Sequence, residues 1–187
     1  MGLFELLLLA VGLSMDAFAV SVCKGLAMDR VSWGRACIPG LWFGAFQGLM
    51  PLLGWFLGAR FARYITAVDH WIAFGLLTVL GVNMLLEARK GPEEADPSLS
   101  WRIMLAMAVA TSIDALAVGI TFAFLSINVL PASAFIACVT FLFSAAGVKL
   151  GGLFGSRLQA RAQVLGGVIL VFLGIKILLE HTGRLPF

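Results

Sequence analysis

Two aspartates stand in nearly identical apolar stretches of this chain. Asp16 lies in "SMDAFAVS" (14–21) and Asp114 in "SIDALAVG" (112–119), which align at an offset of 98 residues. An ionised carboxylate at the centre of a membrane-spanning helix costs about 2.5–3.5 kcal/mol on insertion scales. Protonation, pairing with a basic side chain or a cation shared by both carboxylates would offset this cost. No Lys or Arg stands at a matching depth in the sequence, so a metal site, a proton relay, or competition of protons and metal for the same oxygens remain.

Neutral oxygen donors accompany the two aspartates. Gln47 and Ser144 align at an offset of 97 and fall at mid-depth in two other apolar stretches, where they could bind a cation or join helices by a hydrogen bond. Ser14 and Ser112 precede the aspartates by two positions and do not share their face of a regular helix. Such serines more often donate to the backbone of their own helix, so both are at most supporting residues.

Two further polar residues, Asn83 and Glu87, stand near the end of an apolar stretch, where water can reach. Glu87 is expected first as a boundary residue and, in a sharper hypothesis, as part of a vestibule for cations. Carboxylate, amide and hydroxyl oxygens without Cys or His favour a hard or borderline divalent ion such as Mg²⁺, Mn²⁺ or Ca²⁺ over Cu⁺ or Zn²⁺. The ligand chemistry alone does not choose among these three ions.

The elements that must position these residues are membrane-spanning helices. Of the 187 residues, 61% are hydrophobic and 12% charged, and the mean hydropathy is +1.02. Six apolar windows approach or reach the length of roughly 20 residues needed for a spanning helix: 3–23, 36–58, 68–87, 103–125, 129–152 and 164–180. Their continuous apolar character excludes a β-barrel, and the remaining loops are too short for a separate soluble domain. The sequence therefore predicts an all-α membrane protein with six transmembrane helices, whose environment is the lipid bilayer.

Basic residues predict the orientation of the chain. With the N-terminus outside, the cytoplasmic segments hold eight basic residues (Lys24, Arg30, Arg35, Arg89, Lys90, Arg102, Arg157 and Arg161) and the outer segments hold three (Arg60, Arg63 and Arg184). The positive-inside rule therefore favours an arrangement with both termini outside. The net charge of +3 follows from this bias, and no clustered basic face indicates nucleic-acid binding. Lys149, near the inner end of the fifth span, is expected to extend to the cytoplasmic surface.

The chain repeats a unit of three helices. "LGVNMLLE" (80–87) aligns with "LGIKILLE" (173–180), and the small changes in offset along the chain are what different loop lengths produce. The domain prediction is a first repeat at 1–87, a cytoplasmic linker at 88–102 and a second repeat at 103–187. Because three spans are an odd number, the second copy must enter the membrane from the opposite side. Inverted repeats of this kind commonly hold substrate and ion sites at their interface near the midplane.

Small residues and one proline mark the second and fifth spans. Glycines recur there mostly at four-residue steps, at positions 40, 44, 48, 54, 58, 147, 151 and 155. This spacing predicts close helix packing. Pro51 is expected to kink the second span or to break it locally.

Four stretches together resemble the MntP family of bacterial manganese efflux pumps, which is related to the LysE-type exporters. They are "GLSMDAFAVSVCKG", "FGAFQGLMPLLGWFLG", "DHWIAFGLLTVLG" and "TSIDALAVG", and the resemblance covers essentially the whole chain. It implies an inner-membrane exporter that removes Mn²⁺ from the cytoplasm, with Asp16 and Asp114 as the central carboxylates. Within this resemblance Gln47 is a residue that tunes the site, and Lys149 is unusual in its glycine-rich span.

The resulting hypothesis is a secondary transporter, not an enzyme, in which Asp16 and Asp114 bind Mn²⁺ jointly and Gln47 completes the ligand shell. Mn²⁺ is the transported substrate, no cofactor is expected, and exchange for protons is a natural coupling because protonation weakens metal binding. The alternatives are export of another cation or an amino acid and, in a different class, a membrane enzyme or assembly factor acting on lipid. The sequence leaves the oligomeric state open, a homo-oligomer included.

Overall fold

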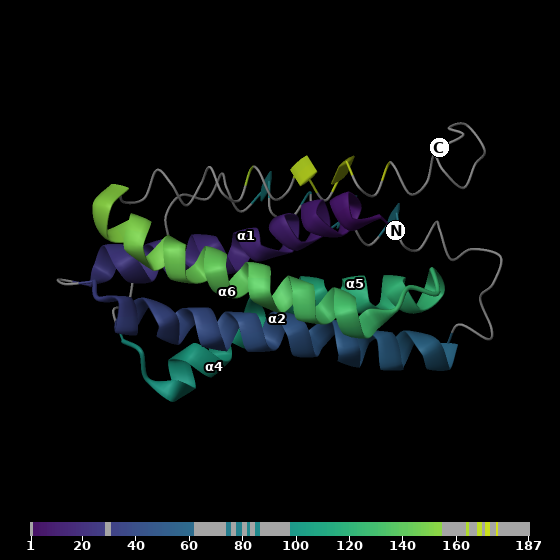
Figure 1. Ribbon diagram of the computed structural model, residues 1–187, viewed down its shortest axis with the longest axis horizontal. Coiled ribbons are helices and arrows are strands. Elements are labelled where there is room, and N and C mark those ends of the chain that lie inside the picture. Colours follow the sequence, from purple (N-terminus) through teal and green to yellow (C-terminus); the bar gives the residue numbers. More distant parts are fainter. Residues whose placement is uncertain are drawn as a thin grey trace.

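The computed structural model describes residues 2–28, 31–61 and 98–154, together with isolated positions between 74 and 86 and between 164 and 175. The longer described segments form five α-helices and contain no strand (Figure 1). These helices are α1 (Leu3–Ala27), α2 (Trp33–Phe61), α4 (Trp101–Ala110), α5 (Ile113–Phe124) and α6 (Val129–Phe154). The prediction of an all-α chain is confirmed.

Three of the described helices are long and apolar enough to cross a membrane: Leu3–Ala27, Trp33–Arg60 and Val129–Leu153. A fourth span is possible if the bent pair α4 and α5 crosses as one unit. These four correspond to the apolar windows at 3–23, 36–58, 129–152 and 103–125. The windows at 68–87 and 164–180 lie mostly outside the described residues.

The helix break falls in the fourth span. The window at 103–125 reads as one continuous span in the sequence, but α4 ends at Ala110, α5 begins at Ile113, and the two are bent by 43°. The hydroxyl groups of Thr111 and Ser112 donate to carbonyls of α4 at this point, which offers the backbone an alternative to regular helix. The helix α2, by contrast, continues through Pro51, so the local break considered for that proline does not occur.

Helices α2 and α6 lie side by side and run in opposite directions (Figure 1). Gly40, near the start of α2, faces Phe141 in the middle of α6, whereas Gly48, further along α2, faces Ala137 and the backbone of Ser133 nearer the start of α6. These contacts have the close spacing that small residues allow when lipid supplies no hydrophobic drive for association. The predicted close packing of the glycine positions is therefore present between these helices.

The other two large helix contacts are parallel. Along α6, Gly147 meets Phe18 and Gly151 meets Val22, so α1 and α6 run in the same direction. Gly54 likewise meets Leu116 before Gly58 meets Ala123, so α2 and α5 also run in the same direction.

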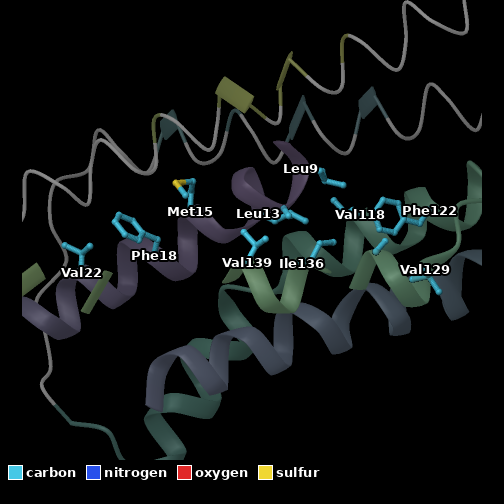
Figure 2. Packing of buried hydrophobic residues seen from close by; sticks show 12 residues of the cluster. Leu9, Leu13, Met15, Phe18, Val22, Val118, Phe122, Val129, Ile136 and Val139 are labelled. Atoms are coloured by element: carbon cyan, nitrogen blue, oxygen red, sulfur yellow. The ribbon is translucent and has the colours of Figure 1, made fainter. Parts of the chain in front are cut away.

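The apolar core joins α1, α5 and α6. Its buried members shown in Figure 2 include Leu13 and Phe18 of α1, Phe122 of α5, and Ile136 and Val139 of α6. Phe18 also packs edge-on against Phe143, with ring centroids 6.1 Å apart. This packing joins α1, which carries Asp16, to α5, which carries Asp114, through α6.

Candidate functional site

Asp114 lies in the first turn of α5, directly after the helix break. Its side chain is buried, with 7% exposed. The atom Oδ1 accepts a hydrogen bond from the backbone N–H of Ala115 at 2.7 Å. The atom Oδ2 is buried and has no hydrogen-bond partner among the residues that the structure describes. One carboxylate oxygen is therefore fixed by the backbone, and the other is available to a ligand.

Asp16 lies within α1 and acts electrostatically on Asp114. Its Oδ1 atom is buried. Two carboxylates on helices far apart in the sequence thus come close enough for their charges to interact. When both are ionised they repel each other in a low-dielectric interior, and a cation between them reverses the sign of the interaction.

Gln47 of α2 connects the surroundings of the two aspartates. Its fully buried side chain donates from Nε2 to the carbonyl of Leu13 at 3.1 Å and to the carbonyl of Thr111 at 2.9 Å. Because both neighbours are acceptors, the amide must turn its NH₂ group toward them. Its Oε1 atom is buried without a hydrogen-bond partner in the described part of the chain, and the side chain also interacts with the Asp114 carboxylate.

The carbonyls bound by Gln47 occupy corresponding positions in the sequence. Leu13 and Thr111 are separated by 98 residues, the same offset that relates Asp16 to Asp114. One amide group therefore connects two backbone carbonyls, each belonging to the residue three positions before an aspartate. The sequence indicates Gln47 as an oxygen donor, but its role as a bridge between the two motifs depends on helix contacts that a single sequence does not reveal.

The five remaining predicted site residues, three serines and two residues near the end of a span, differ in their surroundings. Ser14 donates to the carbonyl of Val11 in its own helix at 2.9 Å. Ser112, between α4 and α5, donates to the carbonyl of Ala108 in the preceding helix at 2.6 Å. Ser144 of α6 is fully buried and its Oγ has no hydrogen-bond partner among the described residues. Asn83 and Glu87 lie outside the described residues.

The donor set suits a hard dication. The described residues contain no group of three or more His, Cys, Asp or Glu side chains that could hold a metal ion. The charged groups that can bind a cation here are therefore the carboxylates of Asp16 and Asp114, whose combined charge balances that of a divalent cation. Amide and hydroxyl oxygens such as those of Gln47 would have to complete the shell, as is common for Mg²⁺, Mn²⁺ and Ca²⁺.

Two lysines bind backbone carbonyls near one end of the bundle. Lys24, which the charge count treats as a loop residue, lies within α1 with 1% exposed and donates to the carbonyl of Ser98 at 2.8 Å. Lys149 donates to the carbonyl of Val31 at 2.9 Å, and its Nζ lies 4.8 Å from the ring centroid of Trp33. Lys149 is thus held by the connection between α1 and α2. Lys24 stands eight residues, or about 12 Å, along α1 from Asp16.

The family of the chain follows from comparison with known proteins. A family model named Mntp and described as "Putative manganese efflux pump" matches residues 30–178. This chain belongs to that family. The resemblance noted in the sequence is therefore confirmed, and MntP is a family of transporters rather than of enzymes.

Similar curated proteins cover the whole chain. A protein of Desulfitobacterium hafniense named "Putative manganese efflux pump MntP" is 57% identical over 99% of this chain and 98% of its own length. MntP proteins of Acetivibrio thermocellus and Mannheimia succiniciproducens are 52% and 50% identical, over 100% and 97% of this chain and 96% and 98% of their own lengths. No solved structure matches the chain. Together with the apolar helices, the family makes this a multi-pass membrane protein.

Proposed function

We propose that this protein is a secondary transporter that exports Mn²⁺ from the cytoplasm across the bacterial inner membrane. The cation binds between Asp16 and Asp114, and Oε1 of Gln47 contributes a neutral oxygen. The observation that carries the proposal is the buried amide of Gln47, which donates to the carbonyls of Leu13 and Thr111, each three residues before an aspartate. The charge of Asp16 also acts on Asp114. The names of the similar proteins supply the ion and the direction of transport.

The binding step follows from the charges of the donors. A dication that leaves water loses hydration free energy, and two carboxylates in a low-dielectric interior compensate for it more strongly than neutral oxygens do. The bound ion in turn removes the repulsion between Asp16 and Asp114. Both the ion and the site are therefore stabilised by binding, whereas the empty site favours protons on its carboxylates.

Exchange for protons is the coupling that this chemistry favours. Protonation of either carboxylate removes one charge from the site and weakens its hold on the metal. A higher proton concentration outside the cell would then promote release of Mn²⁺ there. Mn²⁺ is the substrate in this scheme, and the scheme requires no cofactor.

Alternating access is proposed to arise from two inverted repeats, 1–87 and 103–187, joined by the linker at 88–102. The antiparallel contact of α2 with α6 supports inversion, because two repeats of the same orientation would make these helices parallel. The inversion that relates α1 to α5 and α2 to α6 also relates the parallel pair α1–α6 to the parallel pair α2–α5. The contacts of Gly54 with Ile120 and of Gly151 with Val22 correspond to each other in the same way.

The proposed orientation has both termini outside, as the basic residues favour. With this orientation α1 and α6 run inward and α2 and α5 run outward. Asp16, Asp114 and Gln47 all come from one chain, so the site itself requires no oligomer.

Mn²⁺ flux into proteoliposomes tests the proposal. Asp16→Asn and Asp114→Asn keep the size of each side chain and remove its charge, and each is expected to abolish Mn²⁺ transport. Thr121→Val is the matched control, because this buried hydroxyl, seven residues along α5 from Asp114, donates to the carbonyl of Ala117 in its own helix. Transport of Mn²⁺ by both Asn variants at the wild-type rate would contradict the proposal. Transport of Mg²⁺ or Ca²⁺ instead of Mn²⁺ by the wild-type protein would favour the alternative that the substrate is another cation.

A further inference from the structure

Buried hydroxyl groups fall into two classes in the described helices. The first class donates to carbonyls of its own or the preceding helix, as Ser14, Thr111, Ser112 and Thr121 do. The second class is at most 3% exposed and has no hydrogen-bond partner among the residues that the structure describes; it comprises Ser21, Ser133, Thr140 and Ser144. A hydroxyl that is buried without a partner is unfavourable, so packing among the described helices does not by itself explain the second class.

Three residues of the second class form a stripe along α6. Ser133, Thr140 and Ser144 are spaced by seven and four residues, which keeps them on one face of a helix. We call these residues the hydroxyl stripe. At 1.5 Å per residue it extends over about 16 Å, or about half the hydrocarbon thickness of a bilayer.

The contacts of α6 on either side show which way the stripe faces. Gly147, at one edge of the stripe, and Gly151, which continues the stripe beyond Ser144, meet α1, whereas Ala137 and Phe141, at the other edge, meet α2. The stripe therefore faces the contact between α1 and α2, the helices that hold Asp16 and Gln47. Its inner end, Ser144, corresponds to Gln47 at an offset of 97 residues.

The corresponding positions of α2 carry no hydroxyl beyond the site. At the same offset Ser133 matches Ala36 and Thr140 matches Phe43, both of which are fully buried and apolar. If the repeats served only to build a symmetric scaffold, the same apolar packing would suffice on α6. The hydroxyl groups therefore mark one direction along the bundle, from the aspartates toward the start of α6.

We propose that the hydroxyl stripe is a second, weaker binding path on which Mn²⁺ leaves the aspartate pair toward the outer face. This inference rests on the proposed function, in which α6 begins outside. Hydroxyl oxygens are hard donors that replace part of the hydration shell of a divalent ion. Because they carry no charge, they bind the ion more weakly than Asp16 and Asp114 and allow it to move on. Ser144 and Thr140, about 6 Å apart along the helix, would take the ion first.

Thr140→Val is the decisive variant because valine keeps the shape of threonine and removes only its hydroxyl. Thr121→Val is the matched control, since Thr121 is 2% exposed and donates to the carbonyl of Ala117 at 3.2 Å. Mn²⁺ affinity is measured by calorimetry on the purified full-length protein, flux in proteoliposomes, and the thermal midpoint by scanning fluorimetry. Thr140→Val is expected to lower the flux by about fivefold with an unchanged Kd and no loss of thermal stability. Thr140→Ser should restore the flux.

The other possible results separate a failure of the path from a failure of the proposed function. Equal Mn²⁺ flux in Thr140→Val and Thr121→Val would overturn the path. A loss of Mn²⁺ affinity that parallels the loss of flux would also overturn it, because the hydroxyl would then belong to the aspartate site. If the wild-type protein binds no Mn²⁺, the proposed function itself fails, which is a separate result from a change in flux alone. If Thr140→Val does not fold, Ser133→Ala is judged by the same criteria.

Discussion

Replacement of Gln47 by leucine tests how the site is assembled. The substitution keeps the approximate volume of the side chain and removes the amide that joins α1, α2 and the break between α4 and α5. The carbonyls of Leu13 and Thr111 then lose a donor inside the bundle. We therefore expect effects on both stability and metal binding.

The size of the stability effect follows from the two hydrogen bonds of Nε2. Each contributes about 0.5–1.5 kcal/mol net, so their loss would cost about 1–3 kcal/mol together. Removal of the buried Oε1, which has no partner among the described residues, offsets part of this loss. A net destabilisation of about 1–2 kcal/mol is expected, which for a chain of this length lowers the thermal midpoint by roughly 2–8 °C.

The expected effect on metal binding is separate. Loss of one neutral oxygen ligand beside two carboxylates should weaken the Kd for Mn²⁺ by about tenfold. Gln47→Glu distinguishes the two roles, because it keeps an oxygen at the site but replaces the NH₂ donor that faces two carbonyls. We expect it to retain Mn²⁺ binding and to lose thermal stability.

Scanning fluorimetry and calorimetry on the purified protein measure both effects, with Thr121→Val as the control. This control loses a buried hydroxyl that bonds to its own helix, away from the residues that Gln47 joins. An unchanged thermal midpoint and an unchanged Kd in Gln47→Leu would refute the assignment of Gln47 as both bridge and ligand.

Three further predictions concern packing, a lysine and pH. Gly54→Ala would drive a methyl group into the carbonyl of Leu116 and should destabilise the fold by about 1–3 kcal/mol. Gly34→Ala, in open space, should leave the thermal midpoint unchanged. Equal midpoints in both variants would argue against the α2–α5 contact. Lys149→Met removes the donor to Val31 and should lower the free energy of unfolding by about 1 kcal/mol and the thermal midpoint with it. An unchanged midpoint would mean that this bond does not contribute to stability. Acidification of the buffer should weaken Mn²⁺ binding because protons and metal compete for the same carboxylates, so a pH-independent Kd would exclude this competition.

Much of the architecture could be predicted from the sequence because membrane helices have a strong compositional signal. The windows at 3–23, 36–58 and 129–152 fall within α1, α2 and α6, since about 20 apolar residues are required to cross the bilayer. The helix break could not be predicted in the same way. Proline is the strongest signal for a break, but α2 accommodates Pro51, and the interruption occurs where Thr111 and Ser112 compete for backbone carbonyls.

The sequence selects candidate residues for the site but does not give the contacts between them. Repetition of the aspartate motif is visible at a fixed offset, which draws attention to Asp16 and Asp114 without knowledge of the fold. The contact of Gln47 with Leu13 and Thr111 depends on three helices packing together, and sequence periodicity does not report such contacts. The same holds for Lys24, whose depth in the bundle is set by the length of α1 and by the backbone at Ser98.

The stoichiometry of Mn²⁺ binding tests the central claim most directly. Calorimetric titration of the wild-type protein, Asp16→Asn and Asp114→Asn distinguishes one shared ion from two separate sites. We predict one intramembrane ion per chain and loss of that ion in each single variant. Two ions per chain, with one remaining after either substitution, would contradict joint binding by the two aspartates.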